Sequence, residues 1–463
     1  MSSLSYNRIV QINVTQQYAP QPNKLQNTAA IVSGNSTTIT PGTTAYIASP
    51  SSLAGYLTSA VSITGISWTS GVVTVSFASA HGIEVGATTP LIVQNVLPSA
   101  YNGNYIATAS TTTALTYSLA SDPGAETALG TAIFGQQAWL IAADATWWAQ
   151  NGQQQGYYVY ESGQTTPATI LTSVQTFLAA NPKTIYNWGF LPGIDTDTTD
   201  AFAFFNLHNA LTSLVKFYLP VTTTTYPNWS AATFKNVFAM VQSPVYGAAS
   251  ELDSIAYMAY ITNITPSPTN KLPPSAYSYL YNVTAYPLTQ ALMTDFADGH
   301  INYASTGAEG GISNVILING DNLDGSPANV AYSIDWQQIQ LDLSLSNAVI
   351  NGSNSTINPL YYNQNGIDRL QAVAANTAAR GIASGLALGQ VVLVQLDPTV
   401  FAQNLSAGLY AGNYVINAVP FATYVAQNPS DYSQGLYQGF QASFVPQYGF
   451  QRIVFNLQAT QFA

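Results

Sequence analysis

The sequence has no cysteine and very little charge. Without Cys, disulfides, thiolate nucleophiles and Cys-ligated zinc sites are excluded. Only 6% of the 463 residues are charged, 9 basic and 20 acidic, against roughly 25% in typical globular proteins. Solubility must therefore depend on Asn, Gln, Ser and Thr. Such a surface suits a subunit surrounded by copies of itself, although an ordinary secreted protein with a polar surface is the alternative.

Basic residues and long apolar runs are also scarce. With a formal net charge of -11 and no Lys or Arg cluster, the chain has no electrostatic footprint for nucleic acid. The N-terminus lacks a basic segment followed by an apolar stretch, and no run of about 18 apolar residues occurs. We therefore expect no nucleic-acid partner, no standard export signal and no direct membrane insertion.

Motifs for catalysis or metal binding are weak. There is no P-loop, no Gly-x-Gly-x-x-Gly after a strand and no Gly-x-Ser-x-Gly elbow. Asp195, Asp197 and Asp200 could bind calcium or act as paired carboxylates, but they precede an expected helix, where acidic residues favour the positive end of the helix dipole. The stretch 319–325 is superficially similar to a calcium loop, yet Leu323 stands where a ligand is required, so a turn is favoured.

The three histidines, His81, His208 and His300, are far apart and show no metal-ligand spacing. A hydrolase that pairs His300 with Asp295 or Asp298 is the one enzymatic alternative. The sequence therefore predicts a protein that is not an enzyme, with no catalytic residue, no metal and no cofactor.

Strand-like segments stand at both ends of the chain. Val10, Ile12 and Val14 alternate with polar residues, and a Pro-containing stretch separates them from the rest. Ile453, Phe455 and Leu457 alternate in the same way near the other end. A strand leaves its N–H and C=O groups unpaired unless it joins a sheet, and a tethered strand can join the sheet of a neighbour. We therefore predict inter-subunit strand arms.

Between the arms, the pattern predicts an α+β or α/β multidomain fold, with a layered sheet-and-helix core and an inserted all-β sandwich. Short β segments separated by Gly, Pro and Asn mark the insertion, whereas strands alternate with amphipathic helices beyond it. The predicted parts are an N-terminal arm (1–25), a core domain (26–61 and 135–330), the inserted β-sandwich (62–134), a C-terminal assembly domain (331–446) and a C-terminal arm (447–463).

Several elements are predicted within these parts. A helix begins near Asp200, capped by Thr198 or Thr199, and runs to about Tyr218. A capping box at 250–253 starts the next helix. Two long helices follow, at 334–350 and 366–388. The last predicted strands cover 391–396, 421–425 and 436–444.

Aromatic residues are abundant, with 30 Tyr and 7 Trp. Clusters such as Trp147 with Trp148 and Tyr157 with Tyr158 could form a carbohydrate-binding platform. Such residues more often fill cores and subunit interfaces, where a ring gives a large contact area, and we favour that interpretation.

The order of arm, α/β core, paired late helices (333–339 and 366–373) and closing strands resembles the sheath proteins of contractile bacteriophage tails. The opening SLSYNRIVQINVTQQYAP is similar to the first strand of one phage sheath-like family. Within the insertion, 80–86, 101–105 and 117–124 are similar to a β-sandwich module frequent in phage structural proteins.

The resemblance implies stacked hexameric rings around a tail tube, joined by strand arms, and contraction that drives the tube through the host envelope. It implies copies of the chain itself, the tail tube, baseplate and tail terminator proteins as partners, and a place in the virion after assembly in the host cytoplasm. Arg369 and Arg380, the only basic residues on the last long helix, are candidate tube-facing residues. The alternatives are a virion adhesin that binds host glycan and a baseplate or S-layer protein, with the insertion projecting outward.

Overall fold

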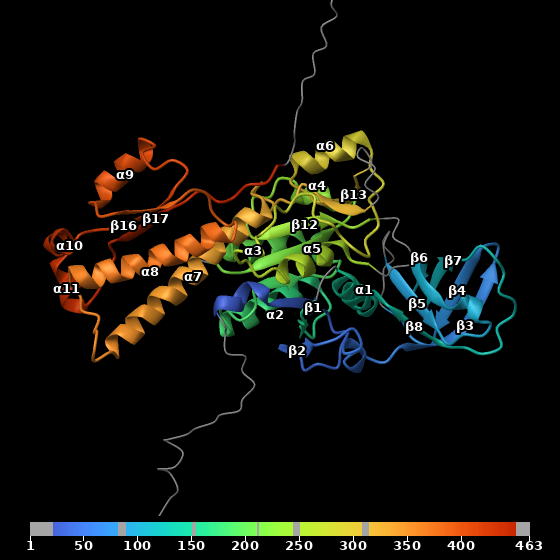
Figure 1. Cartoon of the computed structure of the whole chain (residues 1–463). Coiled ribbons are helices and arrows are strands. Elements are labelled where there is room, and N and C mark those ends of the chain that lie inside the picture. The colour runs from blue at the N-terminus through green and yellow to red at the C-terminus, as the bar shows by residue number, and fades with distance from the viewer. Residues whose placement is uncertain are drawn as a thin grey trace, which may run out of the picture.

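The computed structural model describes residues 22–81, 89–150, 154–210, 213–243, 251–307 and 314–450. The predicted strands at Val10, Ile12 and Val14 and at Ile453, Phe455 and Leu457 lie outside these residues. The described chain is elongated: a β-barrel occupies one end, a layered sheet-and-helix body the middle, and a long helical hairpin with a small sheet the other end (Figure 1).

A six-stranded sheet in the order β12-β11-β10-β1-β9-β2 forms the centre of the body. Five strands are parallel and β2 pairs antiparallel with β9 at one edge. Without β2, the order corresponds to the 2-1-3-4-5 arrangement of doubly wound sheets. The strands are β1 (Ala29–Ser33), β2 (Thr43–Ile47), β9 (Tyr157–Glu161), β10 (Asn187–Gly189), β11 (Lys216–Val221) and β12 (Val237–Val241).

Helices cover both faces of this sheet, which explains why its central strands are continuous apolar runs. Alternate residues of β1, such as Ile31 and Val32, belong to different cores. One core includes α1 (Gly135–Ala149) and α5 (Asp253–Thr262), and the other includes α2 (Pro167–Ala180) and α3 (Thr198–Leu207). Smaller elements complete the body: α4 (Tyr226–Trp229), α6 (Gln290–Asp298), the hairpin of β13 (Tyr303–Thr306) and β14 (Val315–Ile318), and the short 3-10 helices η2 (Pro22–Asn27), η3 (Leu53–Gly55) and η5 (Ile194–Thr196).

The insertion is all-β as predicted, but it is a closed barrel and not a two-sheet sandwich. Its strands follow the order β3-β4-β7-β6-β5-β8, and β8 pairs with both β3 and β5 to close the ring. Sandwiches and barrels share the same alternation of buried and exposed residues, so the pattern alone cannot separate them. The strands are β3 (Val61–Thr69), β4 (Val72–Phe77), β5 (Pro90–Gln94), β6 (Gly103–Thr111), β7 (Ala114–Ser118) and β8 (Thr131–Phe134), with the 3-10 helix η4 (Ser99–Tyr101).

The far end is built on two long helices, α7 (Ala328–Ser353) and α8 (Gln364–Ala383), that pack against each other (Figure 1). α8 also packs on a three-stranded sheet in the order β15-β16-β17. None of the described helices has both the length and the hydropathy needed to cross a membrane. The remaining elements are β15 (Val391–Val394), α9 (Pro398–Ser406), β16 (Tyr414–Ala418), α10 (Phe421–Gln427), α11 (Pro429–Gln434) and β17 (Phe440–Ser443).

The mixed α/β class is confirmed, while several local predictions are wrong. The helix expected to reach Tyr218 ends at Leu207, because the segment from Lys216 is the buried strand β11. The segment 421–425, predicted as a strand, begins helix α10. The described part of the predicted capping box has other partners, since Glu251 binds Thr284 and Asp253 accepts from Ser243.

Candidate assembly surfaces

The sheet β15-β16-β17 has two open edges. β16 is the central strand, parallel to β15 and antiparallel to β17. Within the described residues no further strand pairs with the outer edge of β15 or of β17. Open strand edges present unpaired N–H and C=O groups, which are templates for another strand. This sheet therefore offers edges that can receive a strand arm.

Helix α8 holds this sheet through a polar bridge and close packing. The amide of Gln371, which is buried, donates to Val394 O at 2.9 Å and to Ile416 O at 3.0 Å. The small residues Ala374 and Ala378 belong to the same core, so the helix can lie close to the sheet. Both edge strands are thus presented on a rigid support.

The candidate tube-facing arginines lie on α8 with different surroundings. The partly buried Arg369 donates to Pro359 O at 3.0 Å and to Asn358 O at 3.3 Å, and so holds the loop that joins α7 to α8. Arg380 is exposed, with a guanidinium nitrogen 3.5 Å from Ser344 Oγ. In the described structure neither forms an ion pair with a carboxylate. Contact of either residue with a tube stays a prediction.

The side-chain carboxylate of Glu161 lies at the C-terminal ends of β1 and β9, near the place where doubly wound sheets bind ligands. Glu161 is 1% exposed. Its carboxylate accepts from Ser33 Oγ at 2.7 Å, Asn35 N at 2.8 Å, Thr37 N at 3.1 Å, Thr37 Oγ1 at 2.7 Å and Gly163 N at 2.7 Å. Because these five donors already bind the Glu161 carboxylate, we assign them a structural role and not a ligand-binding role.

Two of the three aspartates around α3, Asp195 and Asp197, have structural roles. Asp197, and not Thr198 or Thr199, is the N-cap, because its carboxylate accepts from Asp200 N at 3.2 Å. Asp195 is buried and accepts from Gly193 N at 3.1 Å and from the Thr225 hydroxyl. Burial raises the pKa of Asp195. The capping interpretation is confirmed, with a different capping residue.

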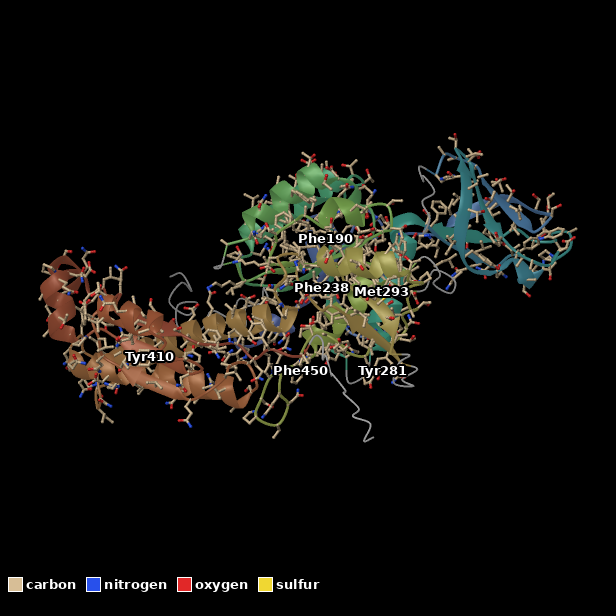
Figure 2. The ribbon with its side chains drawn as sticks, turned by 90° about the horizontal axis from the view of Figure 1, so that it is seen from above. Phe190, Phe238, Tyr281, Met293, Tyr410 and Phe450 are labelled. Carbon is tan, nitrogen blue, oxygen red and sulfur yellow. The ribbon has the colours of Figure 1, made fainter. Side chains whose placement is uncertain are left out.

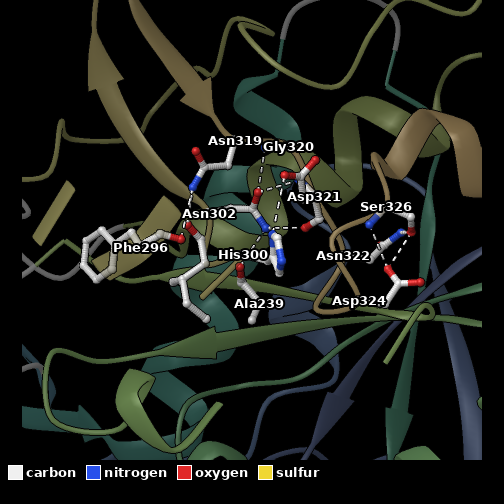
Figure 3. A network of polar contacts seen from close by, with 11 residues as sticks. Ala239, Phe296, His300, Asn302, Asn319, Gly320, Asp321, Asn322, Asp324 and Ser326 are labelled. Atoms are coloured by element: carbon white, nitrogen blue, oxygen red, sulfur yellow. Dashed lines mark hydrogen bonds and ion pairs between the residues drawn. The ribbon is translucent and has the colours of Figure 1, made fainter. Parts of the chain in front are cut away.

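His300 lies beside the turn at 319–325, which Figure 3 shows. Its Nδ1 is 4.0 Å from Asp321 Oδ2, whereas Asp295, the expected partner, accepts from the Tyr226 hydroxyl at 3.3 Å. The Asn302 side chain accepts from Asp321 N at 2.9 Å and donates to Asp321 O at 2.7 Å, so it holds the turn in place. The turn is confirmed.

The other two histidines lie in different parts of the fold. The ring of His81 packs 5.8 Å from the ring of Phe77 in the barrel, and His208 Nε2 lies 2.6 Å from Gln175 Oε1 in the body. Burial lowers the pKa of His208. Across the described residues, no three metal-ligating side chains form a group.

The Trp147 and Tyr157 rings lie in the core, with centroids 4.9 Å apart. The indole of Trp147 donates to Gln155 O at 2.9 Å, and the indole of Trp148 donates to Asp144 Oδ1 at 2.8 Å. A sugar platform at these residues is excluded by burial of the Trp147 and Tyr157 rings. The core interpretation of this cluster is confirmed.

Comparison with known proteins gives one structural similarity to report. No family model matches the chain, and no curated protein matches it. Among solved structures, the chain is similar to a sheath tail protein from Listeria innocua, with 10% sequence identity and a TM-score of 0.41. The alignment covers 90% of this chain and 94% of that protein.

Proposed function

We propose that this protein is the subunit of a contractile phage tail sheath. Hexameric rings of the chain stack around a tail tube, strand arms join the rings, and contraction drives the tube through the host envelope. The tail tube, baseplate and tail terminator proteins are its partners in the virion, which is assembled in the host cytoplasm. The role is structural and not enzymatic.

The open edges of the sheet β15-β16-β17 are the observation that carries this proposal. Each arm of about ten residues adds several backbone hydrogen bonds to a neighbouring sheet, each contributing about 0.5–1.5 kcal/mol net. Because these bonds belong to tethered arms and not to globular faces, subunits can rotate and repack while the connections persist.

The scarcity of charge supports the same function. In the described residues, one Lys or Arg side chain forms an ion pair, the exposed Lys183 with Asp342 at 3.3 Å, and His300 Nδ1 lies 4.0 Å from Asp321 Oδ2. Interfaces between copies must therefore depend on backbone hydrogen bonds, polar side chains and apolar contacts. Such an assembly should depend weakly on salt, because little of its energy is screened Coulomb attraction.

The test is negative-stain electron microscopy of the full chain and of two truncations, one without Ser2–Gln16 and one without Arg452–Ala463. We expect hollow tubes of stacked rings from the full chain, and from each truncation a folded core that forms no tubes. Normal tubes from both truncations would contradict the proposal.

A matched pair of point variants tests the strand alternation directly. Phe455→Asp places a charge on the apolar side of the C-terminal arm, whereas Gln458→Asp places the same charge on its polar side. Only the first should abolish tubes. Single rings or flat sheets would favour a baseplate or S-layer protein, and a persistent monomer that binds glycan would favour an adhesin.

A further inference from the structure

A tyrosine-lined groove lies on the body, outside the surfaces described above. It has a volume of about 340 Å³ and contains no charged residue. Tyr260 of α5 forms one wall, and the segment 273–281 forms the rest. We call it the tyrosine groove; its lining residues are Tyr260, Pro273, Pro274, Ala276, Tyr277, Ser278, Tyr279 and Tyr281.

Pairing with β14 keeps residues 278–280 extended, whereas Ala276 and Tyr277 form a turn in which Tyr277 has a φ of +66°. Tyr279 and Ile316 form an antiparallel bridge, in which Leu317 N donates to Ser278 O and Leu280 N donates to Val315 O, both at 2.9 Å. Side chains alternate along an extended segment, so Ser278 and Leu280 are buried. Tyr277 and Tyr279 point outward and are 48% and 45% exposed.

The backbone N–H and C=O of Tyr279 point away from β14. In this type of antiparallel pair, the bonds to β14 come from the residues on either side, and the N–H and C=O of the central residue point away. No partner for the Tyr279 N–H or C=O occurs among the described residues. An extended peptide has a C=O and an N–H with the spacing needed to bind the Tyr279 N–H and C=O together, so a peptide fits this position better than a saccharide ring.

The described chain ends beside this groove. Asn329 Nδ2 donates to Gln447 O at 3.0 Å, which fixes the last described residues against α7. Gly449 lies so close to Pro274 that a Cβ there would be 2.3 Å from the Pro274 Cβ. Phe450 is 77% exposed, and Figure 2 shows Phe450 and Tyr281 toward the same side of the molecule.

We propose that residues 451–463 of the same chain dock in the tyrosine groove before assembly, as a strand added beside Tyr279. Their apolar alternation, Ile453, Phe455 and Leu457, supplies one face for the exposed tyrosine rings. On either side of Tyr279 the backbone is occupied, because Tyr277 N donates to Leu317 O at 2.8 Å and the Gln150 amide binds both Tyr281 N and Tyr281 O. The backbone contact is therefore confined to Tyr279, and the 13 residues after Phe450 are more than enough to reach it.

This docking gives the C-terminal arm two alternative sites, a consequence that rests on the proposed function. In an isolated subunit the arm occupies its own groove, and in the sheath it occupies the open sheet edge of a neighbour. The arm must leave the groove before it can join a neighbour, so the groove delays premature polymerisation.

Crosslinking of the full chain tests the docking, and the absence of native cysteine gives a clean background. The test variant carries Ala276→Cys in the groove and Asn456→Cys on the polar side of the arm. The control carries Leu409→Cys, which is exposed in the C-terminal part, with the same Asn456→Cys. With a short bis-maleimide at a protein concentration that keeps the chain monomeric, we expect an intramolecular crosslink at least ten times faster in the test variant.

A second pair of variants separates docking from chance proximity. Tyr277→Ser with Tyr279→Ser, added to the test variant, should slow the crosslink at least fivefold, whereas Tyr432→Ser, an exposed tyrosine on α11, should not. Equal rates in test and control variants, or no crosslink in a folded protein with two titratable thiols, would overturn the proposal. A crosslinked dimer whose yield rises with concentration would instead assign the groove to a second copy. Tube formation is measured separately. Tubes without the crosslink would contradict the docking of the arm but not the proposed sheath function.

Discussion

The carboxylate of Glu161 joins two loops at the end of the central sheet through five hydrogen bonds. Glu161→Ala removes the acceptor of the buried Ser33 and Thr37 donors and of Asn35 N. Because unsatisfied buried donors are costly, we expect a loss of at least about 3 kcal/mol in the free energy of unfolding, measured by urea denaturation. Glu126→Ala, an exposed position in the barrel, should change it by less than about 0.5 kcal/mol.

A second prediction at the residue scale concerns pH. Burial raises the pKa of Asp253 well above its ordinary value, and the nearby Glu251 raises it further. A raised folded pKa contributes stability at low pH, and this contribution is lost as the pH rises from the ordinary Asp value through the folded pKa. Asp253→Asn removes the cost of ionisation, so its melting temperature relative to the parent should increase as the pH rises above the ordinary Asp pKa of about 4.

Thermal melts at several pH values check this expectation, with Asp298→Asn, an exposed carboxylate on α6, as the control. A difference between Asp253→Asn and the parent that does not change with pH would contradict it. Other buried carboxylates, including Asp144 and Asp335, have pKa values raised by burial as well. The comparison between variant and parent isolates Asp253 from these groups.

Two glycines at the entrance of the C-terminal sheet allow a prediction at the scale of an element. Gly389 precedes β15 with φ +80°, and a Cβ there would lie 1.9 Å from Gly412 O. Gly412 has a similar φ of +75° but no atom within 4 Å of its Cβ position. Gly389→Ala should therefore cost at least about 2 kcal/mol more than Gly412→Ala, which carries only the backbone strain of about 1–2 kcal/mol.

Hydrogen exchange locates the effect of these substitutions. Gly389→Ala should remove protection from the amides shared by β15 and β16, while the amides of β11 keep theirs. It should also impair tube formation, because β15 is one of the open edges. Equal loss of protection in both glycine variants would show that the close contact with Gly412 has no energetic role.

At the scale of elements, sequence patterns succeeded where one period dominated. Strand β15, predicted at 391–396, and helix α8, predicted at 366–388, lie close to their predicted places, because an apolar run and a helical spacing continue through them without interruption. The sequence patterns gave the wrong element at β11, predicted as part of a helix, and at α10, predicted as a strand. The strand β11 is buried on both faces and continues an aromatic run from α3, so its apolar residues satisfy a helical period as well as an extended one.

The whole molecule places the barrel at the end opposite to α8 and the C-terminal sheet (Figure 1). The two ends of the insertion are adjacent, since Val61 pairs with Ala132. Replacing Ser62–Ile133 by a short linker should leave a folded body that still forms tubes. Stability should fall by about 2 kcal/mol, because Ile92 and Ile133 pack on Ala138 of α1 and their apolar contact is lost.

Electron microscopy and thermal melts of this deletion variant check both expectations. A soluble, cooperative protein without tubes would mean that the barrel takes part in contacts between subunits. An aggregated product would mean that the exposed face of α1 needs the barrel for folding. In either case the insertion would be more than an outward projection.

The sequence by itself determined the chemistry that is excluded and the kinds of element present. The absence of cysteine, the 6% charge and the alternation of apolar residues are local properties of composition and spacing. Only the tertiary structure decided the closure of the barrel by β8, the five donors around Glu161 and the binding of Arg369 to the α7–α8 loop. These features depend on where segments distant in the chain meet; Ser33 and Glu161, for example, are 128 residues apart. Such meetings are set by the packing of whole helices and sheets, which local periodicity does not encode.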